Sequence, residues 1–148
     1  MRFAIVAAAF LSTVGSAAAS GGLSCEVEDE DVRIAVTSGV TRGMGSPIFN
    51  FRGTLEILDK AVTEDLRKTE FDGSHVAQYW LDEVNLRLLL YRERANEKPH
   101  GYVELTIRTQ AGDDDGLYGG TYKLAVFDYA TGQDRSWSYE APISCFVE

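Results

Sequence analysis

The sequence predicts an all-β fold, an antiparallel β-sandwich of about eight or nine strands. Apolar and polar residues alternate from Val84 to Thr109, which is the period of a strand with one buried face. Similar short segments recur along the chain, with turn residues between them and little helical pattern. A disulfide between Cys25 and Cys145 would join the terminal strands, which suits two packed sheets. A small β-barrel is the alternative.

Residues 1–19 predict a signal peptide rather than part of the fold. Arg2 gives a positive start, Phe3 to Val14 is apolar but too short to span a bilayer, and Ala17 to Ala19 offers a cleavage site. We expect cleavage after Ala19, leaving 20–148 as a single domain; an uncleaved membrane anchor is the alternative. This short, alanine-rich leader suits a periplasmic or secreted bacterial protein, in whose oxidising compartment the two cysteines would pair.

The charge of the chain excludes some classes of partner. It has 23 acidic and 14 basic residues, a formal net charge of −9. Such a protein repels nucleic acid and anionic membrane surfaces, so we expect neither as a partner. After signal cleavage, no apolar stretch is long enough to span a membrane.

The first half of the predicted domain contains four strand-like segments. An edge strand around Cys25 precedes an acidic turn, and alternation then predicts a strand over 32–37. A glycine-rich loop over 41–47 leads to a long strand over 49–57, which Gly53 would bend or bulge. The segment 61–66 is ambiguous between a helical turn and a short strand.

The dipeptide Asp72-Gly73 predicts a type I′ hairpin that joins strands over 66–71 and 74–81. Ser74 could instead cap a helical turn over 76–81, but the aromatic residues there favour a strand. In the hairpin, His75 would face Glu70.

The central hairpin, over 84–109, allows two registers that keep its leucines facing the apolar residues of the second strand. One places Arg87 opposite Arg108. The other places Arg87 opposite Thr106 and Tyr91 opposite Tyr102. Because like charges directly opposite each other cost stability, we predict the second register.

The last hairpin follows a polar loop over 111–120. Gly132 suits the first central position of a two-residue type II′ turn. That turn sets Val126 opposite Tyr139 and Leu124 opposite Ala141, and it requires Pro142 to mark an edge or a bulge.

The sequence contains no recognisable catalytic constellation. Its only histidines are His75 and His100, no Gly-x-Ser-x-Gly motif is present, and nothing pairs the histidines as zinc ligands. We therefore expect no catalytic residues, no enzymatic activity and no cofactor.

Two loops offer weaker candidates for ligand sites. Asp113 and Asp115 supply oxygen ligands for calcium, although the EF-hand spacing is absent and a solvated loop is the simpler interpretation. The other loop could bind an anion through backbone amides and a guanidinium, or could simply turn the chain; its residues are Arg42, Gly43, Gly45 and Ser46.

One face of the central hairpin is a candidate interaction surface. Arg87, Tyr91, Tyr102 and Arg108 lie opposite the leucine row, and aromatic residues with arginine are typical of interfaces. If both faces of the sheet were covered, the same residues would be core. We expect an exported, non-enzymatic binding or accessory module for a protein or another envelope component. A small secreted hydrolase that uses carboxylates, and a purely structural envelope protein, are the alternatives.

Overall fold

The computed structural model describes residues 20–41, 48–95 and 98–148. The predicted signal peptide and the candidate anion-binding residues Arg42, Gly43, Gly45 and Ser46 lie outside these ranges. Nine strands, one helical turn and one 3₁₀ turn make up the described chain: β1 (Ser20–Glu28), β2 (Val32–Thr41), β3 (Ile48–Ile57), α1 (Glu64–Arg67), β4 (Lys68–Asp72), η1 (Gly73–His75), β5 (Val76–Leu81), β6 (Asn85–Glu93), β7 (Gly101–Ala111), β8 (Leu117–Asp128) and β9 (Arg135–Val147).

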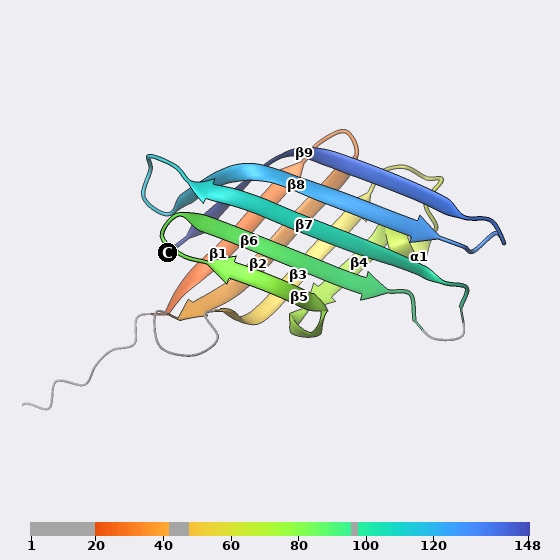
Figure 1. Ribbon diagram of the computed structural model, residues 1–148, viewed down its shortest axis with the longest axis horizontal. Helices are drawn as coiled ribbons and strands as arrows, with labels where there is room; N and C mark the ends of the chain where they lie inside the picture. The colour runs from red at the N-terminus through yellow and green to blue at the C-terminus, as the bar shows by residue number, and fades with distance from the viewer. Residues whose placement is uncertain (1–19, 42–47, 96–97) are drawn as a thin grey trace, which may run out of the picture.

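All nine strands belong to one antiparallel sheet with the order β4-β3-β2-β1-β9-β8-β7-β6-β5. The sheet folds back on itself, so that β1 to β4 pass behind β5 to β9 as a second layer (Figure 1). Its two edges, β4 and β5, are consecutive in the chain. The predicted all-β fold is confirmed, in the form of a single, nearly closed sheet.

The core lies between the two layers and follows from the alternation. In β2, every second residue is buried, beginning with Val32. Leu86, Leu88 and Leu90 of β6 are at most 2% exposed, and Val103, Leu105 and Ile107 of β7 are fully buried. Leu88 lies opposite Ile107 and Leu90 opposite Leu105. β-Branched residues such as Val103 and Ile107 have a restricted χ1 angle and pack well on such pleated, buried faces.

The two layers are joined where β1 meets β9. This pairing extends only from Leu23 to Glu26 on β1, and Cys25 lies directly opposite Cys145. The two sulfur atoms form a disulfide between residues 120 positions apart, as predicted. A disulfide indicates an oxidising, extracytoplasmic environment. Within the described ranges, no helix is long and apolar enough to cross a membrane.

The register predicted for the central hairpin is wrong. Arg87 lies opposite Arg108, and Thr106 lies opposite Leu89. The shift is two residues, so the leucines still face inward. The physical reason lies at the closing loop, where the Arg94 N–H donates to the Gly101 carbonyl (2.8 Å) and the Arg94 side chain is held by buried partners. The loop therefore fixes the register, and it places two arginines side by side.

The type I′ hairpin at Asp72-Gly73 is also wrong. β4 and β5 are not paired; they form the two edges of the sheet, and η1 connects them. The Asp72 carboxylate accepts the Ser74 N–H (2.8 Å), and Nδ1 of His75 accepts the Asp72 N–H (3.0 Å). This reciprocal cap stabilises a 3₁₀ turn, so His75 does not face Glu70. The favoured strand over 76–81 is confirmed as β5, and the helical turn α1 begins within the ambiguous segment 61–66 and ends one residue beyond it.

The register predicted for the last hairpin is wrong by two residues. Val126 lies opposite Trp137 and Leu124 opposite Tyr139, because β8 continues to Asp128, opposite Arg135. The strands are closed by a six-residue loop, 129–134, rather than a two-residue turn.

Three local expectations have different outcomes. The polar loop predicted over 111–120 is shorter, because β8 begins at Leu117. The irregularity in the β2–β3 pairing lies between Thr37 and Gly39, whereas Gly53 pairs in register. Pro142 lies just before the segment of β9 that pairs with β1, where β9 has a neighbour on one side only.

Candidate binding face

The structure places all four residues of the predicted interaction surface on the outward face of the front layer. Arg87 and Tyr91 come from β6, and Tyr102 and Arg108 from β7. They point outward because successive side chains of a strand alternate between the two faces of the sheet. The residues next to them on each strand, such as Leu86 and Ile107, are buried in the core. Trp80 of β5 joins them, since it lies directly opposite Arg87. We call these five residues the binding face.

Arg87 and Arg108 form a directly opposed pair of cations. Both are exposed, and neither makes an ion pair among the described residues. The nearest partner is Asn85, whose side-chain oxygen lies 3.4 Å from Nη2 of Arg87. In a chain with a net charge of −9, this pair is a local site of positive charge.

Trp80 extends this row onto the edge strand. It is 59% exposed, and its indole Nε1–H donates to Oδ2 of Asp82 (2.6 Å). Asp82 also accepts the N–H groups of Val84 and Asn85. The hydrogen bond from the indole has the largest effect, followed by those from the two amides, and together they lower the pKa of Asp82 to about 2. The carboxylate thus stays ionised and orients the exposed indole.

An aromatic cluster occupies the other end of the binding face. The ring centres of Tyr91 and Tyr102 are 5.5 Å apart, and Phe127 of β8 stacks on Tyr102 at 5.7 Å. Tyr91 donates to Glu93 (2.8 Å), and burial together with this hydrogen bond raises the pKa of Tyr91 to about 12. The tyrosines are half-buried by one another. They are thus neither core residues nor freely exposed.

Between the arginines and the tyrosines lies a hollow of about 680 Å³. Leu89 and Thr106 are half-buried there, and they lie opposite each other. The hollow is lined by Gln78, Tyr79, Trp80, Arg87, Leu88, Leu89, Glu104, Thr106 and Arg108. Its floor is Leu89 and Thr106, with the two arginines at one side and Glu104 at the other.

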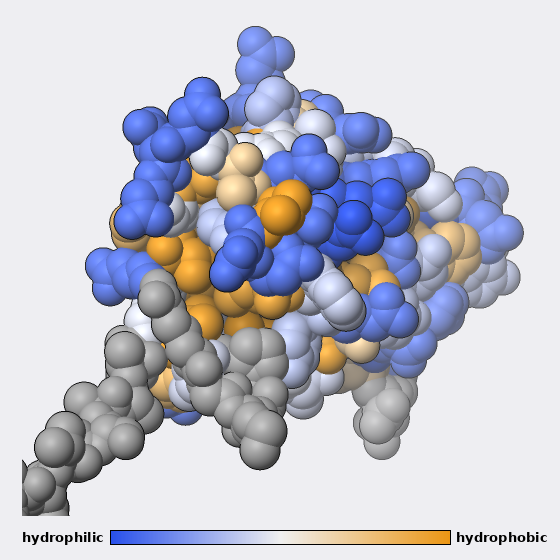
Figure 2. All heavy atoms as spheres, turned by 60° about the vertical axis from the view of Figure 1, so that its left-hand side comes forward, coloured by the Kyte–Doolittle hydropathy of each residue, from blue (hydrophilic) through white to orange (hydrophobic). Residues whose placement is uncertain are grey.

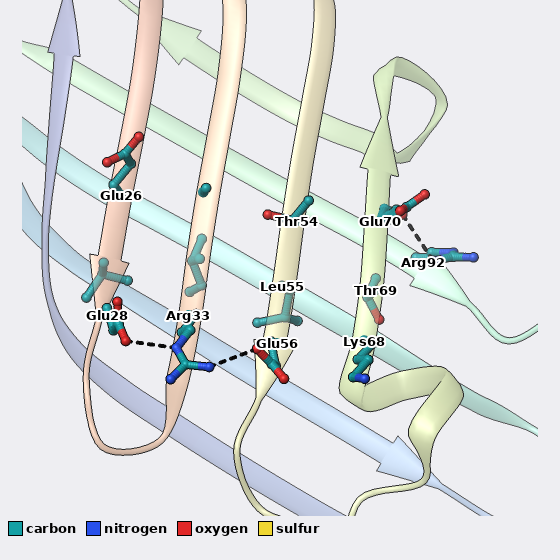
Figure 3. A pocket seen from close by; sticks show the side chains of 13 residues that line it. Glu26, Glu28, Arg33, Thr54, Leu55, Glu56, Lys68, Thr69, Glu70 and Arg92 are labelled. Atoms are coloured by element: carbon teal, nitrogen blue, oxygen red, sulfur yellow. Dashed lines mark hydrogen bonds and ion pairs between the residues drawn. The ribbon is translucent and has the colours of Figure 1, made fainter.

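A larger hollow, of about 1000 Å³, lies on the outward face of the back layer (Figure 3). Its charges are mostly matched within the protein: Arg33 contacts Glu28 at 2.8 Å and Glu56 at 3.1 Å. Arg92 reaches across from β6 and donates to the backbone carbonyl of Glu70 (3.1 Å). No aromatic residue lines it. This surface is polar, and its arginines already have partners within the protein. Within the described ranges, it therefore lacks the free cations and aromatic rings that the binding face presents to a partner.

The Asp113 and Asp115 loop borders a third hollow, at the end of the molecule where β9 finishes. Figure 2 shows hydrophobic side chains gathered at this end with hydrophilic ones around them. Val84, Leu117 and Phe146 are exposed. Both aspartates are exposed, and within 20–41, 48–95 and 98–148 no three His, Cys, Asp or Glu side chains are placed to hold a metal ion. The calcium hypothesis gains no support.

The hydrolase hypothesis gains none either. A general acid that works near neutral pH needs a carboxyl group with a raised pKa. Every described carboxyl group with a displaced pKa is displaced downward: Asp29, Asp65, Asp72, Asp82 and Asp128. The ring of His100 packs against Phe127 in a tilted arrangement (5.4 Å, 44°) and His75 serves as a cap, so the two histidines play separate local roles.

One buried polar cluster was not predicted from the sequence. Arg94, only 3% exposed at its side chain, contacts Asp65 (2.7 Å) and Asp128 (3.0 Å), and Thr63 donates to Asp128 (2.9 Å). Asp128 is the last residue of β8 and occupies an inward position of its alternating pattern, where an apolar residue is expected. An acidic residue at such a position is the sequence signal that could have revealed the cluster. All these groups are satisfied within the protein, so the cluster has a structural role.

Comparison with known proteins gives no relative. No protein-family model, no curated protein and no solved structure matches the chain. Its function must therefore be argued from its own residues.

Proposed function

We propose that the protein is an exported, non-enzymatic binding module that contacts a partner protein through its binding face. The observation that carries this proposal is the pairing of Arg87 with Arg108 beside the exposed indole of Trp80. Arginine, tryptophan and tyrosine are the residues that contribute most to protein–protein binding energy.

The setting of the face supports this role. Regular strands hold the residues, and the half-buried tyrosine cluster limits the rotamers of its members. Ordering such side chains on binding therefore costs little conformational entropy. The two cations make no ion pair among the described residues, and each guanidinium group has five N–H donors, so most of their hydrogen-bonding capacity remains for another molecule.

Export is supported by two observations. The disulfide indicates an oxidising compartment, and residues 1–19 have the sequence pattern of a signal peptide. We place the processed protein in the bacterial periplasm or outside the cell.

The proposal is tested by affinity capture from an envelope extract of the native cells, with the oxidised protein as bait and mass spectrometry as the readout. A stoichiometric partner should be lost with Trp80→Ala and with Arg87→Gln. It should remain with Tyr129→Ser and Arg52→Gln, which change an exposed aromatic and an exposed arginine elsewhere.

Two results contradict the proposal. One is the absence of any stoichiometric partner, and the other is a partner that all four variants retain. Melting curves of each variant must match the parent, so that loss of capture reports the surface rather than the fold.

A further inference from the structure

The arginine pair is held in a position that the free protein does not favour. Like charges directly opposite each other on a sheet are destabilising. Arg87 and Arg108 occupy this arrangement because the Arg94 loop sets the register of β6 on β7. Positions that break a local rule without a compensating contact are often functional sites.

No carboxylate of the described chain compensates the pair. Glu104 is on the same face but lies four residues along β7 from Arg108, about 13 Å by strand rise. The oxygens of Asp82 are already used by Trp80, Val84 and Asn85. The remaining compensation is solvent or a ligand.

We propose that Arg87 and Arg108 together bind a single carboxylate of the partner protein, from an aspartate, a glutamate or a chain end. This inference rests on the proposed function and names the chemistry of the partner. Directly opposed side chains on neighbouring strands start about 5 Å apart, so both guanidinium groups can reach the two oxygens of one carboxylate. Planar guanidinium groups match this geometry and bind it more specifically than ammonium groups do.

The row around the pair suits an extended segment of polypeptide. Trp80, Arg87, Arg108 and Thr121 lie side by side on four adjacent strands, which span about 14 Å. An extended segment of about four residues has this length. Its carboxylate would lie over the arginines, an apolar group would pack on Trp80, and a neighbouring side chain would enter the hollow above Leu89 and Thr106.

The charge of the whole protein favours one carboxylate over a polyanion. At a net charge of −9, the chain repels nucleic acid and anionic polymers at long range. A single carboxylate on a larger partner is repelled far less, and it meets the local positive charge only at short range. Salt screening of that local attraction should weaken binding.

The test is an NMR titration of protein purified from cells that express the full-length chain, with its disulfide oxidised. The probe is the peptide acetyl-Ser-Ala-Asp-Ala-Ser-amide, and the matched control peptide has Asn in place of Asp. The readouts are the Nε–H signals of the arginines and the indole N–H of Trp80. Trigalacturonate and inorganic phosphate are titrated separately, because they carry anionic groups of other classes.

We expect the Asp peptide to shift the signals of Arg87, Arg108 and Trp80, and the Asn peptide to shift them at least about tenfold less at equal concentration, since charge-assisted hydrogen bonds are lost. Arg87→Gln with Arg108→Gln should abolish the effect. Arg52→Gln with Lys68→Gln, the same charge change on the back layer, should preserve it. Replacing both face arginines by lysine keeps the charge and should still weaken binding.

Three results overturn the inference: equal shifts with the Asp and Asn peptides, loss of binding in the Arg52 and Lys68 control, or binding of trigalacturonate or phosphate alone. None of them removes the proposed function, which fails only if the captured partner is absent or ignores the binding face.

Discussion

Nη2 of Arg94 lies 3.0 Å from Oδ1 of Asp128, and the two side chains are 3% and 0% exposed. The same guanidinium group contacts Asp65 and the carbonyl of Pro99, while Thr63 donates to the second oxygen of Asp128. This cluster fastens the segment before β4, the end of β6 and the end of β8 to one another. It closes the end of the core and, through the Arg94 loop, sets the register of β6 on β7.

Arg94→Ala should destabilise the protein by about 3–5 kcal/mol, because it leaves the buried Asp128 carboxylate without its cation. Urea unfolding measures this loss. Arg33→Ala provides the contrast: its ion pairs with Glu28 and Glu56 are solvent-exposed, and their loss should cost at most about 1 kcal/mol. Equal losses in the two variants would contradict a special role for the buried cluster.

Stability should fall in acid. Burial alone would raise the pKa of Asp128, but the Ala130 N–H, Thr63 and Arg94 lower it, and the net pKa lies below its ordinary value. A carboxyl group with a lowered folded pKa stabilises the protein above its unfolded pKa, about 3.9. That contribution is lost as the pH falls from about 4 through the folded pKa. Urea unfolding at stepwise lower pH should show the decline, and Asp128→Asn should flatten it; an unchanged slope would assign the acid sensitivity to other carboxylates.

Reduction of the disulfide should lower the melting temperature by several degrees. The bond joins residues 120 positions apart, and closing a loop of this length stabilises a chain by about 4–5 kcal/mol in the chain-entropy model. Thermal unfolding with and without reductant measures the effect, with a thiol assay to prove full reduction. The double variant Cys25→Ser, Cys145→Ser should melt like the reduced protein, and an unchanged melt would show that strand pairing alone holds the seam.

Arg108→Thr should stabilise the free protein by a few tenths of a kcal/mol, up to about 1 kcal/mol, because it removes a directly opposed like-charge pair. Differential scanning calorimetry of both proteins measures this difference in stability, which should be largest at low salt, where the repulsion is least screened. The same variant should lose the partner. Added salt should narrow the gap in stability, and a destabilised variant would show that the pair is already compensated within the fold.

The fold class and the core could be predicted from the sequence because alternation survives a register error of two residues. Leu86, Leu88 and Leu90 face inward in either register of the central hairpin. The disulfide followed from the number and position of the cysteines. These inferences depend on which residues alternate along a strand and on how many cysteines the chain contains, and both can be read from a single sequence.

The errors occurred where long-range contacts override local signals. Like-charge repulsion argued against Arg87 opposite Arg108, but the closing loop fastened by Arg94 and Asp128 determines the register. Asp72-Gly73 favours a tight hairpin, yet His75 completes a reciprocal cap that sends the chain from one edge of the sheet to the other. Parity alone could place Arg87, Tyr91, Tyr102 and Arg108 on one face, whereas the direct pairing of the two arginines and the position of Trp80 required the observed register.

The strand order also determines when the sheet can be completed. Seven of the eight strand pairings join neighbours within β1 to β4 or within β5 to β9, and only β1 with β9 joins the two groups. Chain segments close in sequence meet fastest, so each meander can form by itself while the seam between them waits. Cys25 precedes Cys145 by 120 residues in the chain. The Cys25 thiol therefore has no native partner until those residues have been made and β9 has paired with β1, so the native disulfide can form only after the seam has closed.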